Sequence, residues 1–102
     1  VLAAWHAVRG MALAGLGRKT EAVAAGEKAM TLVPVAKDGF EGPVWPSYLA
    51  RIHAMNGEAA AAVAAVRPVI EQRMGIDTVA LLKLDPVWDP IRQSPEFQTL
   101  AK

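Results

Sequence analysis

Residues 17–25 read Gly17-Arg18-Lys19-Thr20-Glu21-Ala22-Val23-Ala24-Ala25, and the stretch 40 positions later reads Gly57-Glu58-Ala59-Ala60-Ala61-Ala62-Val63-Ala64-Ala65. The same shift places Trp5 on Trp45 and Ala14 on Ala54. Alanine is common enough here for some matches to arise by chance, but the Trp and Gly matches are more specific. Self-similarity at one fixed spacing is typical of stacked helical repeats. The sequence therefore predicts an all-α chain with two copies of one unit.

The first copy has the pattern of two helices joined by a glycine turn. Its larger apolar residues from Leu2 to Leu16 recur at three- to four-residue steps, which is the helical period. Gly15 and Gly17 are suited to end this helix, and Pro34 to stop a second helix that starts at Lys19 or Thr20. We expect a hairpin over residues 1–34, and we expect its tryptophan, like the other two of the chain, to pack in the core. The apolar stripe of the first helix consists of Trp5, Val8, Ala12, Leu13 and Leu16.

The second copy follows an interruption. Residues 35–43 carry turn-forming sequences and separate the two copies. A third helix is expected from about Val44 to Asn56, and a fourth from near Glu58, so that the second hairpin covers residues 44–74. Pro68 should kink the fourth helix or split it after Val66, because proline removes an internal hydrogen bond. The buried face expected for the third helix comprises Trp45, Tyr48, Leu49, Ile52 and Met55.

The tail over residues 77–102 predicts a series of short helices. Asp85-Pro86, Asp89-Pro90 and Ser94-Pro95 each place a good N-cap residue directly before proline, and Asp77 or Thr78 can cap a helix that ends at Leu84. The tail has too many apolar residues to leave in water, so it should cover the last hairpin. We therefore expect one domain over residues 1–102, with this tail as a C-terminal cap. The apolar residues of the tail are Leu81, Leu82, Val87, Trp88, Ile91, Phe97 and Leu100.

Composition argues against several partners. Eleven basic and ten acidic residues give a formal net charge of +1, too small a field to attract nucleic acid or an anionic membrane. No apolar run approaches the length of about 18 residues that spans a bilayer. The absence of cysteine fits a reducing compartment, so a cytoplasmic location is expected. The first helix starts at Val1 without a capping residue, and we therefore expect the sequence to be part of a longer protein.

Residues with catalytic potential are few, and each has a structural explanation. His6 and His53 have no second ligand at the spacing that places two side chains on one helix face. Asp85 and Asp89 precede prolines, which favours helix capping over acid and base catalysis. No strand is expected before the glycines, and no Gly-Lys-Ser or Gly-Lys-Thr run of a phosphate-binding loop follows them. The sequence therefore predicts no catalytic residue, no cofactor and no metal site, and the chain is not expected to be an enzyme.

The chain resembles the tetratricopeptide repeat (TPR) family. Small residues, a turn glycine and a terminal proline occupy places typical of that repeat, which is about 34 residues long. Arg9, Gly26 and Val66 depart from the pattern, and the roughly six extra residues fall in the interruption. The resemblance implies two TPR-like hairpins, a fragment of an α-solenoid. The matching positions of the first copy are Gly10, Leu13, Gly17, Ala22, Ala29 and Pro34.

A second resemblance covers most of the chain. The run from Leu84 to Phe97, downstream of residues 17–22 and 33–38, is similar to the C-terminal repeat region of large bacterial signalling proteins. In that group such repeats follow a nucleotide cyclase, a Ser/Thr kinase or a winged-helix DNA-binding domain, whose motifs this sequence does not contain. The resemblance implies an accessory module of a larger bacterial regulator.

The TPR resemblance also implies a binding surface. Such repeats recognise partners through the first helix of each hairpin, and the corresponding residues suit a hydrophobic segment or a partner helix. The same residues could instead pack against one another or against a further repeat. The predicted partner-binding residues are Met11, Val44, Ser47, Arg51 and Met55, accompanied by Ala4, Ala7 and Ala14.

Three hypotheses for the function follow. The first is a non-catalytic module for protein association, in which the face with Leu2, Trp5 and Met11 docks on an upstream domain or repeat, or forms a homodimer through the first helix. The second, from a different class, is a small ligand-binding or enzymatic helical domain with a pocket between the hairpins. The third is RNA recognition by helical repeats, which would show steep salt dependence and which the charge balance disfavours.

Overall fold

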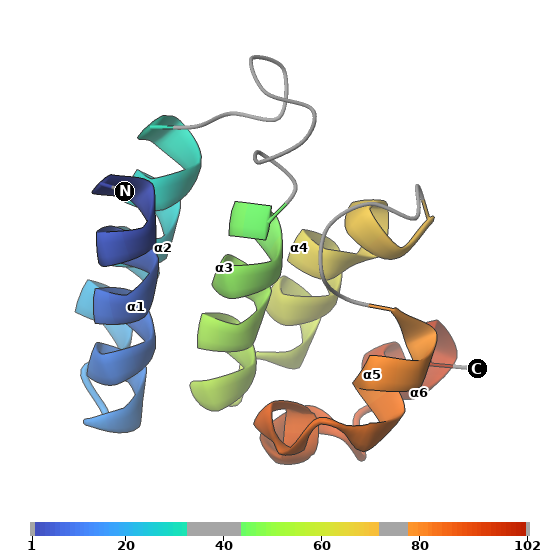
Figure 1. The fold of residues 1–102 in the computed structure, drawn as a ribbon. Coiled ribbons are helices and arrows are strands. Elements are labelled where there is room, and N and C mark those ends of the chain that lie inside the picture. Colours follow the sequence, from blue (N-terminus) through green and yellow to red (C-terminus); the bar gives the residue numbers. More distant parts are fainter. Residues whose placement is uncertain (1, 33–43, 72–77, 102) are drawn as a thin grey trace.

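The computed structural model describes residues 2–32, 44–71 and 78–101, and every element in these ranges is helical. The elements are α1 (Leu2–Gly15), α2 (Lys19–Leu32), α3 (Val44–Met55), α4 (Ala59–Glu71), α5 (Val79–Leu84), the 3₁₀ helix η1 (Pro86–Ile91) and α6 (Pro95–Leu100). They form three groups: α1 with α2 at one end, α3 with α4 in the middle, and the short helices at the other end (Figure 1). The all-α prediction is confirmed. The interruption predicted over residues 35–43 lies outside the described residues.

Both helix pairs turn on the same backbone geometry. Gly17 and Gly57 have φ angles of 81° and 79°, in the left-handed region that glycine enters without a steric penalty. The N–H of Arg18 donates to the carbonyl of Leu13, and the N–H of Glu58 donates to the carbonyl of His53, each at 2.9 Å. These bonds satisfy carbonyls that the end of a helix leaves free. The chain therefore folds back after α1 and after α3 (Figure 1), and the repeated glycine has a local cause.

The helix α3 packs on both α1 and α2, and glycine makes this close approach possible. A Cβ atom built on Gly10 would lie 2.6 Å from Cδ1 of Ile52, and one built on Gly26 would lie 2.8 Å from the same atom. Ile52 is fully buried there, so two glycines form the cleft that receives it. The buried face predicted for the third helix is confirmed, because Trp45, Leu49 and Ile52 are buried. Its other two residues, Tyr48 and Met55, are half-buried.

The C-terminal tail is ordered by side-chain caps and by one apolar cluster. Thr78 Oγ1 accepts from the N–H of Leu81, Asp85 Oδ1 accepts from Val87, and Ser94 Oγ accepts from Phe97. These caps start α5, η1 and α6 as the sequence predicts. The apolar residues of the tail then cover the α3–α4 pair. The cluster contains Leu82, Trp88, Ile91 and Phe97 from the tail and Ala50, Ala54, Ala62, Val63 and Val66 from α3 and α4.

The predicted split of the fourth helix after Val66 is wrong, because α4 runs without a break from Ala59 to Glu71 with Pro68 inside it. Pro68 lies in the last turn and is exposed, and the alternative of a kink there stays a prediction. The helix start predicted at Asp89 is also wrong. Asp89 lies within η1, where its Oδ1 accepts from Nε of Arg92 at 3.0 Å. A 3₁₀ segment tolerates the second proline, so a new helix start is not needed there.

Candidate functional site

The predicted partner-binding residues do not form an open surface. Ser47 is fully buried, so its assignment to a binding surface is corrected. Met11 and Met55 are half-buried against the cluster that contains Ile52. The side chain of Arg51 is only 14% exposed, with Nη2 3.9 Å from Oδ2 of Asp85. Val44 begins α3, and its side chain lies outside the described residues. These residues mark an inner surface between neighbouring helices.

The open surface lies instead on the other side of α1. Trp5, Val8 and Leu16 are 58%, 61% and 74% exposed, and Arg9 and Ala12 between them are also exposed. Their spacing of three to four residues places them on one side of the helix. We call these five residues the open face of α1. Contiguous exposed apolar surface of this kind marks interaction sites more often than scattered apolar residues do.

Aromatic contacts organise the start of this face. The guanidinium carbon of Arg9 lies 5.8 Å from the centre of the Trp5 ring, within the range of a cation–π contact. His6 meets the same ring edge-on, with ring centroids 4.9 Å apart. Within the described residues Arg9 makes no ion pair, and its guanidinium contacts the Trp5 ring. The face therefore combines an aromatic ring, aliphatic side chains and one cation available to a partner.

The sequence predicted this face only in part. Trp5 was expected in the core and is exposed, so that prediction is wrong; Trp45 and Trp88 are buried as expected. The exposed position of Trp5 is consistent with the docking face that the sequence predicts for it, but that prediction does not include Val8 and Arg9. The signal that could have found them is the repeat itself, because a shift of 40 residues aligns Arg9 with Leu49 and Val8 with Tyr48.

A shallow groove lies where the two helix pairs meet. It has a volume of about 350 Å³ and carries polar and charged groups from both pairs. His53 Nδ1 lies 2.8 Å from Oε1 of Glu58, and this hydrogen bond is the main cause that lowers the pKa of Glu58 below its ordinary value. The amide of Asn56 also bonds Glu58 and the carbonyl of Lys19, each at 3.4 Å. The groove is thus an inter-hairpin contact whose main polar pair is already satisfied.

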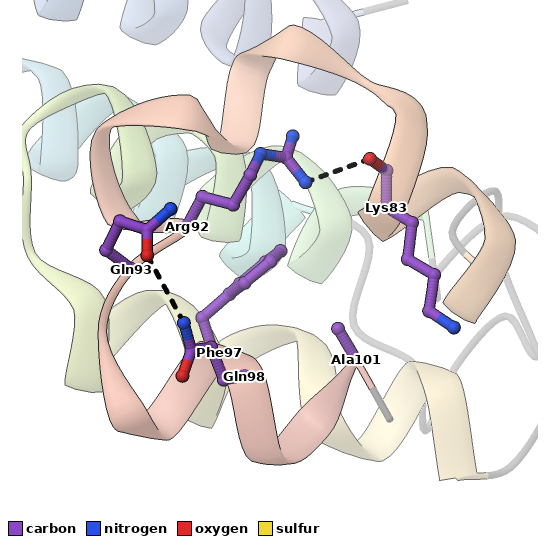
Figure 2. Close-up of a pocket in the computed structure, with 6 residues that line it drawn as sticks. All are labelled: Lys83, Arg92, Gln93, Phe97, Gln98 and Ala101. Carbon is purple, nitrogen blue, oxygen red and sulfur yellow. Dashed lines mark hydrogen bonds between the residues drawn. The ribbon is translucent and has the colours of Figure 1, made fainter.

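A second groove, of about 300 Å³, lies in the C-terminal tail beside Arg92 (Figure 2). The Arg92 guanidinium donates to the carbonyls of Leu82, Lys83 and Asp85 at 2.8 to 3.0 Å, while its Nε bonds Asp89. Figure 2 shows the bond to Lys83 across the groove, with Gln93 and Gln98 joined on the other side. Because most of its N–H donors are engaged with the backbone, Arg92 holds the cap together and is a poor receptor for an anion.

Within residues 2–32, 44–71 and 78–101, no three side chains of the metal-binding types come together. None of the helices in the same ranges has the length and apolar character to cross a bilayer. The open face of α1 is therefore the strongest candidate site in this part of the chain.

No family model, no curated protein and no solved structure matches the chain.

Proposed function

We propose that this chain is a non-catalytic helical-repeat module for protein association, and that it binds through the open face of α1. The observation that carries the proposal is the unequal burial of equivalent residues. Trp5 is 58% exposed, whereas its repeat equivalent Trp45 is 6% exposed because α3 is docked on α1 and α2. A tryptophan, a valine and a leucine exposed on one helix face are costly in water and gain stability when a partner covers them.

The opposite end of the molecule supports this direction of binding. There the helix pair α3–α4 is already covered by Trp88, Phe97 and their neighbours. A stack of helical repeats needs a cap at its ends, because an uncovered terminal repeat exposes the face that a neighbour would bury. One end has such a cap, and the other presents the open face of α1. The TPR-like arrangement and a role in a larger bacterial regulatory protein are parts of the same proposal, and they rest on the sequence resemblance.

Site-specific photo-crosslinking in the cells that naturally make the protein tests this function. A photoreactive amino acid at position 8 should give one dominant polypeptide adduct, while the same group at Glu96, exposed on α6 at the capped end, should give little. Trp5→Ala should reduce the adduct from position 8, because it removes the largest side chain of the face. No adduct, or equal adducts from both positions, would contradict the proposal.

A ligand-binding function is the second candidate, and one observation favours it. The groove between the helix pairs is lined by Lys19, Thr20, Glu27, His53 and Glu58 as well as by apolar side chains. A pocket between hairpins needs such convergent polar groups. It ranks second because His53 and Glu58 are bonded to each other. Titration of the chain with a small-molecule library, followed by NMR, should shift His53 signals if the groove binds; no shift at any compound would exclude it.

A further inference from the structure

The open face of α1 is the first-repeat equivalent of a surface whose docking partner is visible. In α3 this surface consists of Trp45, Leu49 and Ile52, which pack on the α1–α2 pair. The 40-residue shift aligns these residues with Trp5, Arg9 and Ala12. Equivalent faces of a repeat meet equivalent neighbours. The open face of α1 therefore has the geometry to dock on another pair of antiparallel helices.

The two faces differ at the two positions that enter the cleft. Ile52 fills the space between Gly10 and Gly26, and Cδ1 of Leu49 would lie 2.9 Å from a Cβ atom on Gly26. In α1 these places are held by the smaller Ala12 and by the cation Arg9. A partner that offered two glycines to this face would leave a void beside Ala12 and an unpaired charge at Arg9, and both are unfavourable in an interface. Opposite Arg9 the partner must therefore carry a side chain larger than that of glycine, and this side chain must be negatively charged.

A second copy of this chain does not meet these requirements. α1 contains no acidic residue, so two α1 faces placed together would bring cations near each other without a counter-charge. The face of α3–α4 that corresponds to the cleft contains Ala50 and Val66, and it is covered by the C-terminal tail. Contact between the α1 faces of two copies and head-to-tail stacking are both unfavourable.

We propose that the partner of the open face is a separate α-helical hairpin that docks as the α1–α2 pair receives α3, with a carboxylate side chain at the position equivalent to Gly26. This inference rests on the proposed function and specifies its partner. The carboxylate occupies the space that Ala12 leaves and pairs with Arg9, while Trp5 and Val8 pack on the small residues of the hairpin. Charge pairing at the edge of an apolar contact gives specificity and orientation.

A tandem protein tests the proposal directly. Residues 1–40 are placed ahead of the intact chain, which keeps the 40-residue spacing, and the added copy carries Gly26→Glu, Gly26→Gln or no change. Gly26 is suitable because the contacts of its Cβ position are with α3 alone, whereas that of Gly10 would also meet the backbone of α2. The chain has no cysteine, so Val8→Cys in the intact part gives one thiol whose labelling rate reports burial of the open face.

The expected result is graded protection of this thiol. With Gly26→Glu, labelling at position 8 should be about ten-fold slower or more than in the single chain, because labelling then requires the interface to open. Gly26→Gln should protect about five-fold less, the scale of one ion pair, and the difference should vanish in 1 M salt. A thiol at Gln98→Cys, exposed on α6, should label at the same rate in every protein.

Two results would overturn the proposal. Labelling at position 8 that is as fast in the Gly26→Glu tandem as in the single chain excludes a hairpin partner of this kind, and equal protection by Gly26→Gln excludes the carboxylate. A tandem with Arg9→Leu and Ala12→Ile in the intact part recreates the docking face of α3 on an unchanged cleft, so its protection shows that the added hairpin folds. If the tandem gives no protection of the thiol but position 8 crosslinks to a partner, association through the open face stands and the hairpin partner is wrong. If the tandem protects the thiol but position 8 gives no crosslink, the proposed function is contradicted.

Discussion

The helices α1 and α3 begin equivalent repeats, but their equivalent faces differ in burial. The Trp45 side of α3 is buried against α1 and α2, while the Trp5 side of α1 is open. The turn that follows each helix is the same, with a left-handed glycine and, from the residue after it, a 2.9 Å bond to the carbonyl four residues before the glycine. The difference lies in the neighbour, since only α3 has another helix pair before it in the described structure. A repeat sequence therefore specifies which face docks, and the neighbouring repeat decides whether that face is buried.

The largest effect expected from this contrast is at Trp45. Trp45→Ala should lower the free energy of unfolding by about 3 to 5 kcal/mol, because the ring is 6% exposed and packs on Ala3, Ala7 and Ala29. Urea unfolding followed by circular dichroism measures the loss. A loss below about 1 kcal/mol would show that α3 is not anchored on α1 and α2 through this ring.

The glycine cleft gives the next largest effect. Gly10→Ala should destabilise by about 1 to 3 kcal/mol, since its Cβ would lie 2.6 Å from Ile52 Cδ1 and 2.9 Å from the carbonyl oxygen of Ala22. Gly15→Ala, on the same helix, is the matched control, because its nearest neighbour is 3.9 Å away. Urea unfolding of both variants separates the cleft from the general effect of glycine in a helix.

Relief by a second substitution sharpens this prediction. Ile52→Val removes Cδ1, the atom closest to both cleft glycines. It should therefore relieve more of the cost of Gly26→Ala than of Gly10→Ala. The close atom that remains at Gly26 is the flexible Cδ1 of Leu49, whereas at Gly10 it is the backbone oxygen of Ala22, each at 2.9 Å. A double-mutant cycle from unfolding free energies measures the two couplings. Equal couplings would mean that the side chain of Ile52 alone limits the space at Gly10.

The capped end should show a smaller effect. Ser94→Ala removes the acceptor for the N–H of Phe97 and should cost about 1 kcal/mol. Thr99→Ala, in the same helix, is the control, because the Thr99 hydroxyl is exposed and bonds a carbonyl that is already close to water. Thermal unfolding compares the two. Equal midpoints would indicate that α6 is held by Phe97 packing alone and not by its N-cap.

Local features of this fold were predictable from the sequence, because their causes are local. Gly17 ends a helix through its own backbone conformation, and Thr78, Asp85 and Ser94 cap helices through atoms two or three residues away. Asp89 has the same Asp-Pro signature and fails, because the preceding 3₁₀ turn continues through it. An Asp-Pro sequence allows the aspartate to cap a helix, but the backbone conformation of the neighbouring residues determines whether it does.

Burial on the faces of the repeats was less predictable, because it depends on which elements meet. The apolar period of α1 contains both Leu13, which is buried, and Trp5, which is exposed, and periodicity alone does not distinguish them. Small residues identify the inner side: Ala3, Ala7 and Gly10 are buried where α3 approaches. Ser47 was placed on a binding surface by resemblance, but the helices around α3 cover it completely. In α1 the large residues Trp5, Val8 and Leu16 are exposed, whereas Ala3, Ala7 and Ala14 are buried together with Leu13.

A pH dependence should appear at the junction of the two hairpins. The pKa of Glu58 in the folded chain lies below its ordinary value of 4.5, so the unfolded state binds more protons between the two pKa values. The stabilisation is fully present above pH 4.5 and is lost as the pH falls through the lower folded pKa. Urea unfolding from pH 7 to pH 3 should show a smaller decrease for Glu58→Gln than for the wild type.

The smallest expected effect is at Trp5, and it is the most informative for the contrast between α1 and α3. Trp5→Ala removes a cation–π contact with Arg9 worth about 0.5 to 1 kcal/mol at an exposed site, but alanine has the higher helix propensity, and the two changes nearly cancel. The free energy of unfolding should therefore change by less than about 0.5 kcal/mol, against several for the same substitution at Trp45. A loss near that of Trp45→Ala would mean that the Trp5 ring is already covered in solution by another molecule of the chain, and the unfolding midpoint would then rise with protein concentration. An unchanged stability, together with a reduced crosslink from position 8, would separate binding from folding at this face.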